Sequence, residues 1–317
     1  MINQRKQLLR FIITWVITIS VFTIIFSKIR FSEVKNLLAQ IEVRFLAGAI
    51  FFSFIAHTCF SPARYKKILE LLGCNIPFFE TLILRMGSAP IKGILPFKIG
   101  ESVMVAYLHK RHDFSYARGI SSVILVYSFS FFALISFISV GWFFYKLELY
   151  QKIYFAVIFL VFFFIIILFR NSILINFIKN SRKMSPRPRE IFKVLIEKFS
   201  IKSLVTLFIY SLGFEGCKLI NAFFLFKAFS IEIPIEAFLI FTPIVLLLAS
   251  LPITFGGLGT RESAILVFFS EYAVPDRLLG SGLLLSFVNV ICPILFGLFF
   301  IKPFLNRLVN PNRYVRT

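Results

Sequence analysis

Long stretches without charged residues constrain this chain more than any other feature. The hydrocarbon core of a bilayer needs about 20 apolar residues in each helix that crosses it. Of the 317 residues, 58% are hydrophobic and 16% are charged, whereas soluble domains carry about 25% charged residues. We therefore expect an all-α integral membrane protein. The apolar runs cover residues 11–27, 45–63, 119–145, 153–169, 203–226, 237–260 and 278–301, with a short run at 263–272.

The charge balance is strongly basic, with 35 Lys and Arg against 15 Asp and Glu, a net charge of +20. In a soluble protein this excess would indicate nucleic acid as a partner, but the chain has no nucleic-acid-binding motif. Here the basic residues cluster between the apolar runs, which fits contact with anionic lipid headgroups. The expected partners are therefore membrane lipids, anionic or phosphate-bearing, and no nucleic acid.

Basic segments also set the expected orientation, because cytoplasmic flanks of membrane helices are rich in Lys and Arg. The N-terminus, the C-terminus and a linker at 171–202 are basic, so all three are expected in the cytoplasm. The linker divides the chain into halves at 1–170 and 203–317. With these ends fixed inside, residues 79–108 must enter and leave on the same side as a re-entrant hairpin. The fold expected is about eight transmembrane segments plus this hairpin.

Two sequence motifs occur in both halves at a nearly constant spacing. Ile76-Pro77 resembles Ile233-Pro234, and the segment from Leu95 resembles the segment at 251–263. Because the first copy starts and ends inside and the second outside, the halves are expected to be inverted repeats. Pro- and Gly-interrupted segments at corresponding positions indicate a transporter site. The residues expected to break the helices are Pro96, Gly100, Pro252, Gly256, Gly257 and Gly259.

An acidic residue closes each repeated motif, with a base close by. Glu101 follows Lys98, and Glu262 follows Arg261. A charge at membrane depth costs roughly 2.5–3.5 kcal/mol on insertion scales, so each needs a reason. One interpretation is a substrate or proton site, with the bases meeting a phosphate. The other is that each carboxylate caps the N-terminus of a broken helix. Both interpretations stay open.

Further charged and polar residues lie within the apolar segments. Arg85 and Lys92 are a heptad apart, which predicts a shared helix face for a phosphate or for the membrane interface. Glu215 and Lys218 are spaced to form an ion pair across one helical turn, with a role in coupling as the alternative. We interpret three other residues as packing or interhelical hydrogen-bonding groups: His57, Asn221 and Asn289.

Signals of catalysis are weak. The sequence has no Walker motif and no nucleophile elbow, and its Gly-rich stretch at 256–259 is not a dinucleotide fingerprint. His109, His112 and Asp113 could together hold a metal, but we expect no catalytic residue, no metal and no cofactor. The four cysteines lack metal-ligand spacing and are expected to be small apolar side chains.

The two motifs ending at Glu101 and Glu262 resemble the hallmark segments of the flippase-like family, which includes the transmembrane region of lysylphosphatidylglycerol synthase. The resemblance covers most of the chain. It implies a multi-pass protein of a prokaryotic cytoplasmic membrane, related to lipid translocation. In the bifunctional synthases, lysyl transfer belongs to a separate soluble domain. The chain stops shortly after its last apolar run, so we expect a stand-alone member.

The function expected from these features is translocation of a phospholipid, glycolipid or polyprenyl-phosphate-linked lipid, without enzymatic activity. The expected substrate site is formed by Glu101, Glu262, Arg261, Lys98, Arg85 and Lys92. Two alternatives come from other classes: an integral-membrane transferase acting on a lipid-phosphate, and a non-catalytic membrane partner of cell-envelope synthesis proteins. The oligomeric state is left open by the sequence.

Overall fold

The computed structural model describes residues 41–94, 100–144, 200–251 and 254–309. Within these residues every regular element is a helix, as expected for an integral membrane protein. The described residues form four helical spans that are long and apolar enough to cross a membrane. They cover Val43–Leu71, Tyr116–Phe144, Ile201–Ala228 and Pro275–Val309, and Ile235–Ser250 is a shorter apolar helix. The predicted runs at 11–27 and 153–169 lie outside the described residues, so the count of about eight stays a prediction.

The described part of the first half contains two long spans with three shorter helices between them. The first span consists of α3 (Val43–Ile55), η1 (Ala56–Phe60) and α4 (Ser61–Leu71). The short helices are α5 (Phe78–Gly87), α6 (Ala89–Ile94) and α7 (Glu101–His112), and the second span is α8 (Tyr116–Phe144).

The second half repeats this order. One long span, α12 (Ile201–Ala228), is followed by α13 (Ile235–Ser250), η2 (Phe255–Gly257) and α14 (Thr260–Phe268). The last span consists of α15 (Pro275–Ser286), η3 (Phe287–Ile291) and α16 (Cys292–Val309). Pro77 and Pro234 are the N-caps of α5 and α13, so the first repeated motif begins the short helices in both halves.

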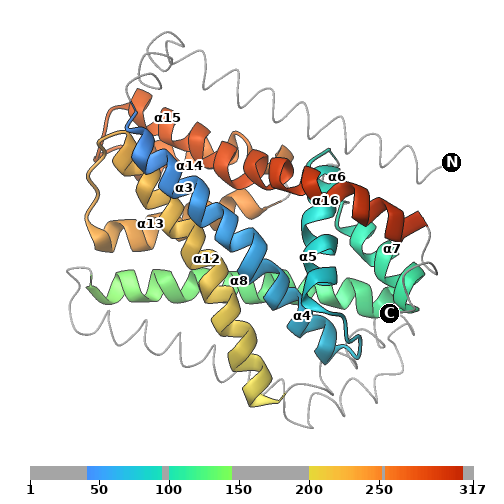
Figure 1. The fold of residues 1–317 in the computed structure, drawn as a ribbon. Coiled ribbons are helices and arrows are strands. Elements are labelled where there is room, and N and C mark those ends of the chain that lie inside the picture. Colours follow the sequence, from blue (N-terminus) through green and yellow to red (C-terminus); the bar gives the residue numbers. More distant parts are fainter. Residues whose placement is uncertain (1–40, 95–99, 145–199, 252–253, 310–317) are drawn as a thin grey trace, which may run out of the picture.

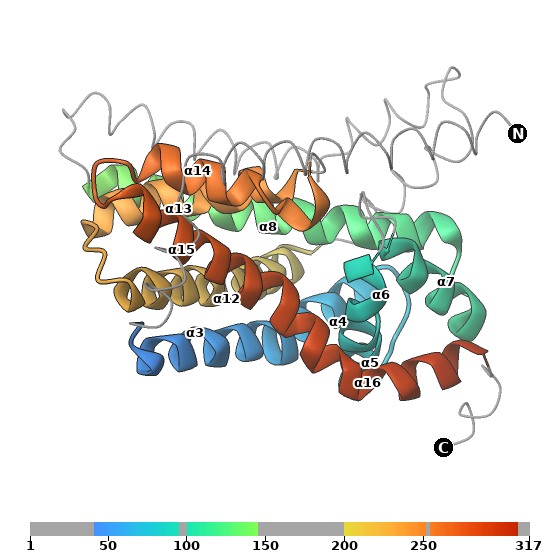
Figure 2. The ribbon, with the colours of Figure 1, turned by 90° about the horizontal axis from the view of Figure 1, so that it is seen from above.

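Corresponding long spans of the two halves run in opposite directions (Figures 1 and 2). The span α3–α4 lies beside α12, and the two are antiparallel. The short helices are exchanged between the halves. Helix α5 of the first half packs on α16 of the second, and α13 of the second half packs on α8 of the first. Each half therefore holds part of the other in place.

The described short helices of the first half form a hairpin whose two ends meet. Glu80 in the first turn of α5 accepts hydrogen bonds from Tyr107 (2.8 Å) and Arg111 of α7, and it contacts His112 at 3.0 Å. The chain thus enters and leaves at one end of the bundle. In the second half the contact between the two hairpin helices is apolar, because Phe241 of α13 stacks on Phe268 of α14 with ring centroids 5.6 Å apart.

Two large clusters make up most of the apolar core of the described residues, and a smaller one is formed by Ala56, Phe214 and Cys217. One large cluster surrounds the hairpin of the second half and includes Leu225, Phe226, Val245, Ile265 and Phe269. The other surrounds the hairpin of the first half and includes Tyr65, Leu84, Tyr107, Leu125 and Phe304. Large apolar side chains also cover the outside of the helices, as expected for a surface that faces lipid. Examples with exposed side chains are Phe51, Phe131, Ile209, Val267 and Phe299.

Two of the long spans contain a single π-helical turn, each just before a proline. In η1, Ser61 donates its N–H to the carbonyl of Ala56, and Pro62 follows. In η3, Cys292 donates its N–H to the carbonyl of Phe287, and Pro293 follows. Proline has no N–H to continue the helical ladder, and π turns are frequent at functional sites.

Candidate functional site

A cavity of about 320 Å³ lies where the hairpins of the two halves are interrupted. Its wall includes the end of α6 and the start of α7 in the first half, and the segment between α13 and α14 in the second. Both π turns also contribute, through His57 of η1 and through Asn289 and Val290 of η3. The site therefore forms only when the two halves are assembled.

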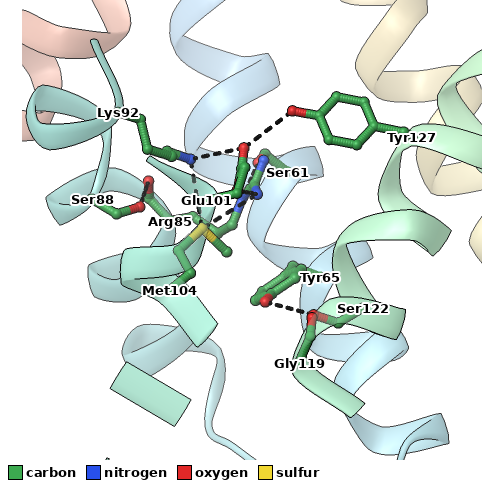
Figure 3. A network of polar contacts seen from close by, with 10 residues as sticks. All are labelled: Ser61, Tyr65, Arg85, Ser88, Lys92, Glu101, Met104, Gly119, Ser122 and Tyr127. Atoms are coloured by element: carbon green, nitrogen blue, oxygen red, sulfur yellow. Dashed lines mark hydrogen bonds and ion pairs between the residues drawn. The ribbon is translucent and has the colours of Figure 1, made fainter. Parts of the chain in front are cut away.

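The polar side of this cavity is a cluster around Glu101 (Figure 3). Lys92 Nζ lies 3.7 Å and Arg85 Nη1 4.0 Å from the Glu101 carboxylate. Tyr127 of α8 donates a hydrogen bond of 3.3 Å to the same carboxylate, from the side opposite Lys92. Arg85 also donates through Nε to the hydroxyl of Ser61, at 2.9 Å. We name Arg85, Lys92, Glu101, Tyr127 and Ser61 the Glu101 cluster.

Charge and position together favour an anion at this cluster. Two cations face one carboxylate, so the cluster carries net positive charge. Glu101 is also the first residue of α7, and its N-cap Gly100 lines the cavity. The N-terminus of a helix offers unpaired N–H groups and a positive dipole end. The arrangement is therefore suited to a phosphate or another anionic group.

Glycine is needed where the two breaks approach other backbone. A Cβ on Gly100 would lie 2.5 Å from the Cα of Lys92, so glycine lets α7 start against α6 and brings Lys92 to Glu101. Gly257 has φ of +77°, and a Cβ there would lie 2.5 Å from the carbonyl oxygen of Ala249. The predicted helix break thus occurs at these positions, while Pro96 and Pro252 lie outside the described residues.

The second acidic residue has different surroundings from Glu101. Glu262 is fully buried, and its carboxylate accepts hydrogen bonds from the N–H of Gly259 (2.6 Å) and from the hydroxyl of Ser286. Arg261 donates to the same hydroxyl at 2.7 Å. Neither residue lines the cavity. Glu262 therefore caps α14 and ties it to α15, which is the second interpretation of the sequence motif.

The other predicted residues occupy definite positions. Glu215 and Lys218 form the expected ion pair within α12, with Nζ and Oε2 2.7 Å apart. Asn221 donates to Asn289 at 3.4 Å, so the expected interhelical hydrogen bond is confirmed. His57 contacts the carbonyl of Ser53 at 2.9 Å through Nδ1, and its ring faces the cavity. Lys98 lies outside the described residues.

Residues of the hairpin ends form a second polar group, away from the cavity. Burial opposes ionisation of Glu80, but hydrogen bonds from His112, Arg111 and Tyr107 outweigh it and hold the pKa of Glu80 at about 2. His109 points instead to the carbonyl of Phe114, at 3.1 Å. His109 and His112, the two histidines of the candidate metal site, thus contact different partners.

Ser61 and Tyr127 belong to the site but were not predicted from the sequence. Both lie within long apolar runs and carry no charge, so composition gives no reason to select them. One signal was present for Ser61, because Pro62 interrupts an apolar helix next to it, and prolines there mark a local departure from α-helical bonding. Tyr127 has no comparable signal, because its role comes from the packing of α8 beside α7.

Comparison with known protein families gives one match. The family model for the lysylphosphatidylglycerol synthase TM region matches residues 7–297. No curated protein matches the chain. The family match includes the hairpins of both halves, and with them every described residue that lines the cavity.

Proposed function

The chain belongs to the family of the lysylphosphatidylglycerol synthase transmembrane region, and from this premise we propose that it translocates a lipid with an anionic or phosphate-bearing headgroup. It is a multi-pass membrane protein of a family linked to lipid modification or translocation. In this proposal the headgroup passes through the cavity while the acyl or prenyl chains stay in the bilayer. The cargo is a phospholipid, a glycolipid or a polyprenyl-phosphate-linked lipid.

One observation carries the proposal: a net positive cavity lies where the hairpins of the two halves are interrupted. Broken helices at the junction of inverted repeats are the usual setting of a transporter's substrate site. Backbone that leaves the helical ladder must face protein or water, because lipid offers it no hydrogen bonds. A polar headgroup can use these same groups as it crosses.

The placement in the membrane follows from the charges at the two ends of the bundle. We propose that both hairpins are re-entrant and that the halves are inverted repeats. The basic end is then cytoplasmic by the excess of Lys and Arg, which agrees with a cytoplasmic C-terminus in the inner membrane of a prokaryote. The basic end carries Lys66, Lys67, Lys110, Arg111 and Arg307 beside Glu70 and Glu80, whereas the opposite end carries Glu232, Glu236, Glu271 and Asp276 beside Arg44, Lys227 and Arg277.

Leaflet exchange in proteoliposomes tests the proposal. The purified protein is reconstituted with fluorescent anionic, aminoacylated and polyprenyl-phosphate lipids in separate preparations. Accessibility of the fluorophore to an external quencher is followed with time. Lys92→Gln and Glu101→Gln are compared with Lys302→Gln, which neutralises an exposed lysine near the end of α16. We expect exchange by the wild type and by Lys302→Gln, and slower exchange by both cavity variants.

The opposite results have clear meanings. Normal exchange in both cavity variants would refute the assignment of the Glu101 cluster as the headgroup path. Folded wild-type protein that exchanges none of the lipids would refute translocation. Product formation from a labelled donor would then favour the transferase, and activity only with an envelope-synthesis protein added would favour the partner role.

A further inference from the structure

We propose that Glu101 is an internal counter-ion, which occupies the cavity in place of a phosphate group and gives up Arg85 and Lys92 when that phosphate binds. This inference rests on the proposed function and deepens it, because it assigns the phosphate subsite and the part that each charged residue has in it. The subsite consists of Arg85, Lys92, the Ser61 hydroxyl and the N-terminus of α7.

The distances within the cluster support the assignment of Glu101 as a counter-ion. Charge-assisted hydrogen bonds between a cationic N–H and a carboxylate are about 2.7–2.9 Å long. Lys92 and Arg85 lie 3.7 and 4.0 Å from Glu101. In the same protein, Lys218 and Glu215 reach 2.7 Å. Arg85 Nη1 and Lys92 Nζ also contact Met104 Sδ, at 3.7 and 3.6 Å. A thioether sulfur is a weak acceptor, so Glu101 neutralises the two cations while both remain suited to a stronger acceptor.

The donors of the subsite also match a phosphate group better than a carboxylate. A single carboxylate has two oxygens and one negative charge, and it faces two cations and a helix N-terminus. A phosphate group offers more oxygens and up to two charges, so it can satisfy Arg85 and Lys92 together. Arg85 is already oriented, because its Nε donates to Ser61 and its guanidinium lies over the ring of Tyr65, 5.2 Å from the centroid.

Glu101 also has a partner outside this subsite. Tyr127 comes from α8 and donates to the carboxylate from the side away from Lys92 (Figure 3). A small movement toward Tyr127 keeps this hydrogen bond and separates the carboxylate from the cations. The charge of Glu101 then no longer competes with the ligand, although its residual repulsion limits how tightly a phosphate is held.

This assignment predicts that removing the negative charge strengthens phosphate binding. A residue that directly binds the headgroup shows the reverse effect when it is neutralised. The probes are inorganic phosphate and dihexanoyl phosphatidic acid, a soluble lipid with a terminal phosphate. The readout is the shift of the thermal unfolding midpoint Tm of the detergent-purified full chain with probe concentration, which reports binding to the folded state.

We expect Glu101→Gln to have a lower Tm than the wild type without a probe, because two cations lose their counter-ion. With a probe we expect its Tm to rise more than that of the wild type, and its apparent Kd to fall by about tenfold. Glu232→Gln is the matched control, since it removes an exposed carboxylate at the far end of the bundle. It should bind the probes like the wild type.

Lys92→Gln gives an independent test that does not depend on the folding of Glu101→Gln. It leaves Arg85 and Glu101 as a balanced pair, so we expect it to lose most of the phosphate-induced shift. Unchanged or weaker probe binding by Glu101→Gln, or wild-type binding by Lys92→Gln, would overturn the proposal.

Comparing the two probes distinguishes a lipid headgroup from free phosphate as the source of the phosphate. Comparing probe binding with leaflet exchange distinguishes the counter-ion role from translocation. Response to the lipid alone assigns the subsite to a lipid headgroup, and response to both extends it to free phosphate. Tighter binding by Glu101→Gln supports the counter-ion role even if leaflet exchange is absent. Normal exchange with unaltered binding refutes the counter-ion role and leaves translocation intact.

Discussion

The hydroxyl of Ser53 in α3 donates a 2.9 Å hydrogen bond to the carbonyl of Val288 in η3, and both residues are buried. The bond joins the first span of one half to the last span of the other, next to the cavity. The carbonyl needs a partner from outside its helix. In the π turn its donor would be the residue five positions on, Pro293, which has no N–H.

Ser53→Ala is expected to destabilise the protein by about 1–3 kcal/mol, because it leaves the Val288 carbonyl buried and unsatisfied. The free energy of unfolding is measured by denaturant titration in detergent. Ser139→Ala is the control, since that hydroxyl donates to the carbonyl of Ile135 in its own helix. Equal losses of unfolding free energy in the two variants would show that the hydrogen bond between the halves contributes no more stability than one within a single helix.

Two glycine substitutions are expected to act in opposite directions. A Cβ on Gly87 would lie 2.4 Å from Phe304 Cβ and 2.7 Å from the Phe300 carbonyl oxygen, so Gly87→Ala should force α5 away from α16 and cost about 1–3 kcal/mol. A Cβ on Gly216 would meet only the Phe137 ring, at an ordinary 3.5 Å. Gly216→Ala should therefore stabilise α12 by about 0.5–1 kcal/mol. Tm in detergent measures both, and destabilisation by Gly216→Ala would contradict the packing described.

Glu80→Gln is expected to open the hairpin of the first half. It leaves Arg111 buried without its counter-charge, at a cost of about 3 kcal/mol. The control is Glu70→Gln, because Glu70 contacts Lys66 and Lys67 at a more exposed site, where ion pairs contribute less than about 1 kcal/mol. Similar losses in unfolding free energy for the two variants would contradict this difference.

The contribution of Glu80 should also depend on pH. Its pKa in the folded protein, about 2, is below the ordinary value of 4.5. A lowered pKa gives stability that is complete above pH 4.5 and is lost as the pH falls toward 2. The Tm difference between wild type and Glu80→Gln should therefore stay constant near neutral pH and shrink below pH 4.5. A difference that grows in acid would contradict the lowered pKa.

Glu215 and Lys218 should show strong coupling in a double-mutant cycle. Glu215 is 2% exposed, so Lys218→Met removes the cation that it contacts directly and leaves it the more distant charge of Arg64, which should cost about 3 kcal/mol. Replacement of both residues by Gln and Met should cost much less than the sum of the single changes. Unfolding free energies of the four proteins measure the coupling. Additive losses would mean that the ion pair is not maintained in the membrane protein.

The sequence predicted the repeated parts of this fold more closely than the site. Pro77 and Pro234 lie at equivalent helix starts because proline has no N–H to donate and suits the start of a helix. The 251–263 motif predicted a broken helix because its glycines allow positive φ, which the structure has at Gly256, Gly257 and Gly259. Local backbone conformations that depend on proline or glycine can therefore be predicted from the sequence.

The different environments of Glu101 and Glu262 were not predictable from their motifs. Both close a repeated segment and both lie in the first turn of a helix. Their surroundings come from side chains that the motifs do not contain: Tyr127 and Arg85 around Glu101, and Ser286 beside Glu262. These contacts depend on how α8 and α15 pack, and tertiary packing between distant segments leaves no local sequence pattern.

The π turns at Ala56–Phe60 and Phe287–Ile291 have a consequence for how the cavity wall can rearrange. Each turn holds one residue more than an α-helical register accommodates. If that surplus residue is passed along to the next turn, the side chains in between rotate by about 100° around the helix axis, the angle of one residue at 3.6 per turn. Asn289 and Val290 can then exchange places with their neighbours at the cavity while both ends of the span stay anchored in the bilayer.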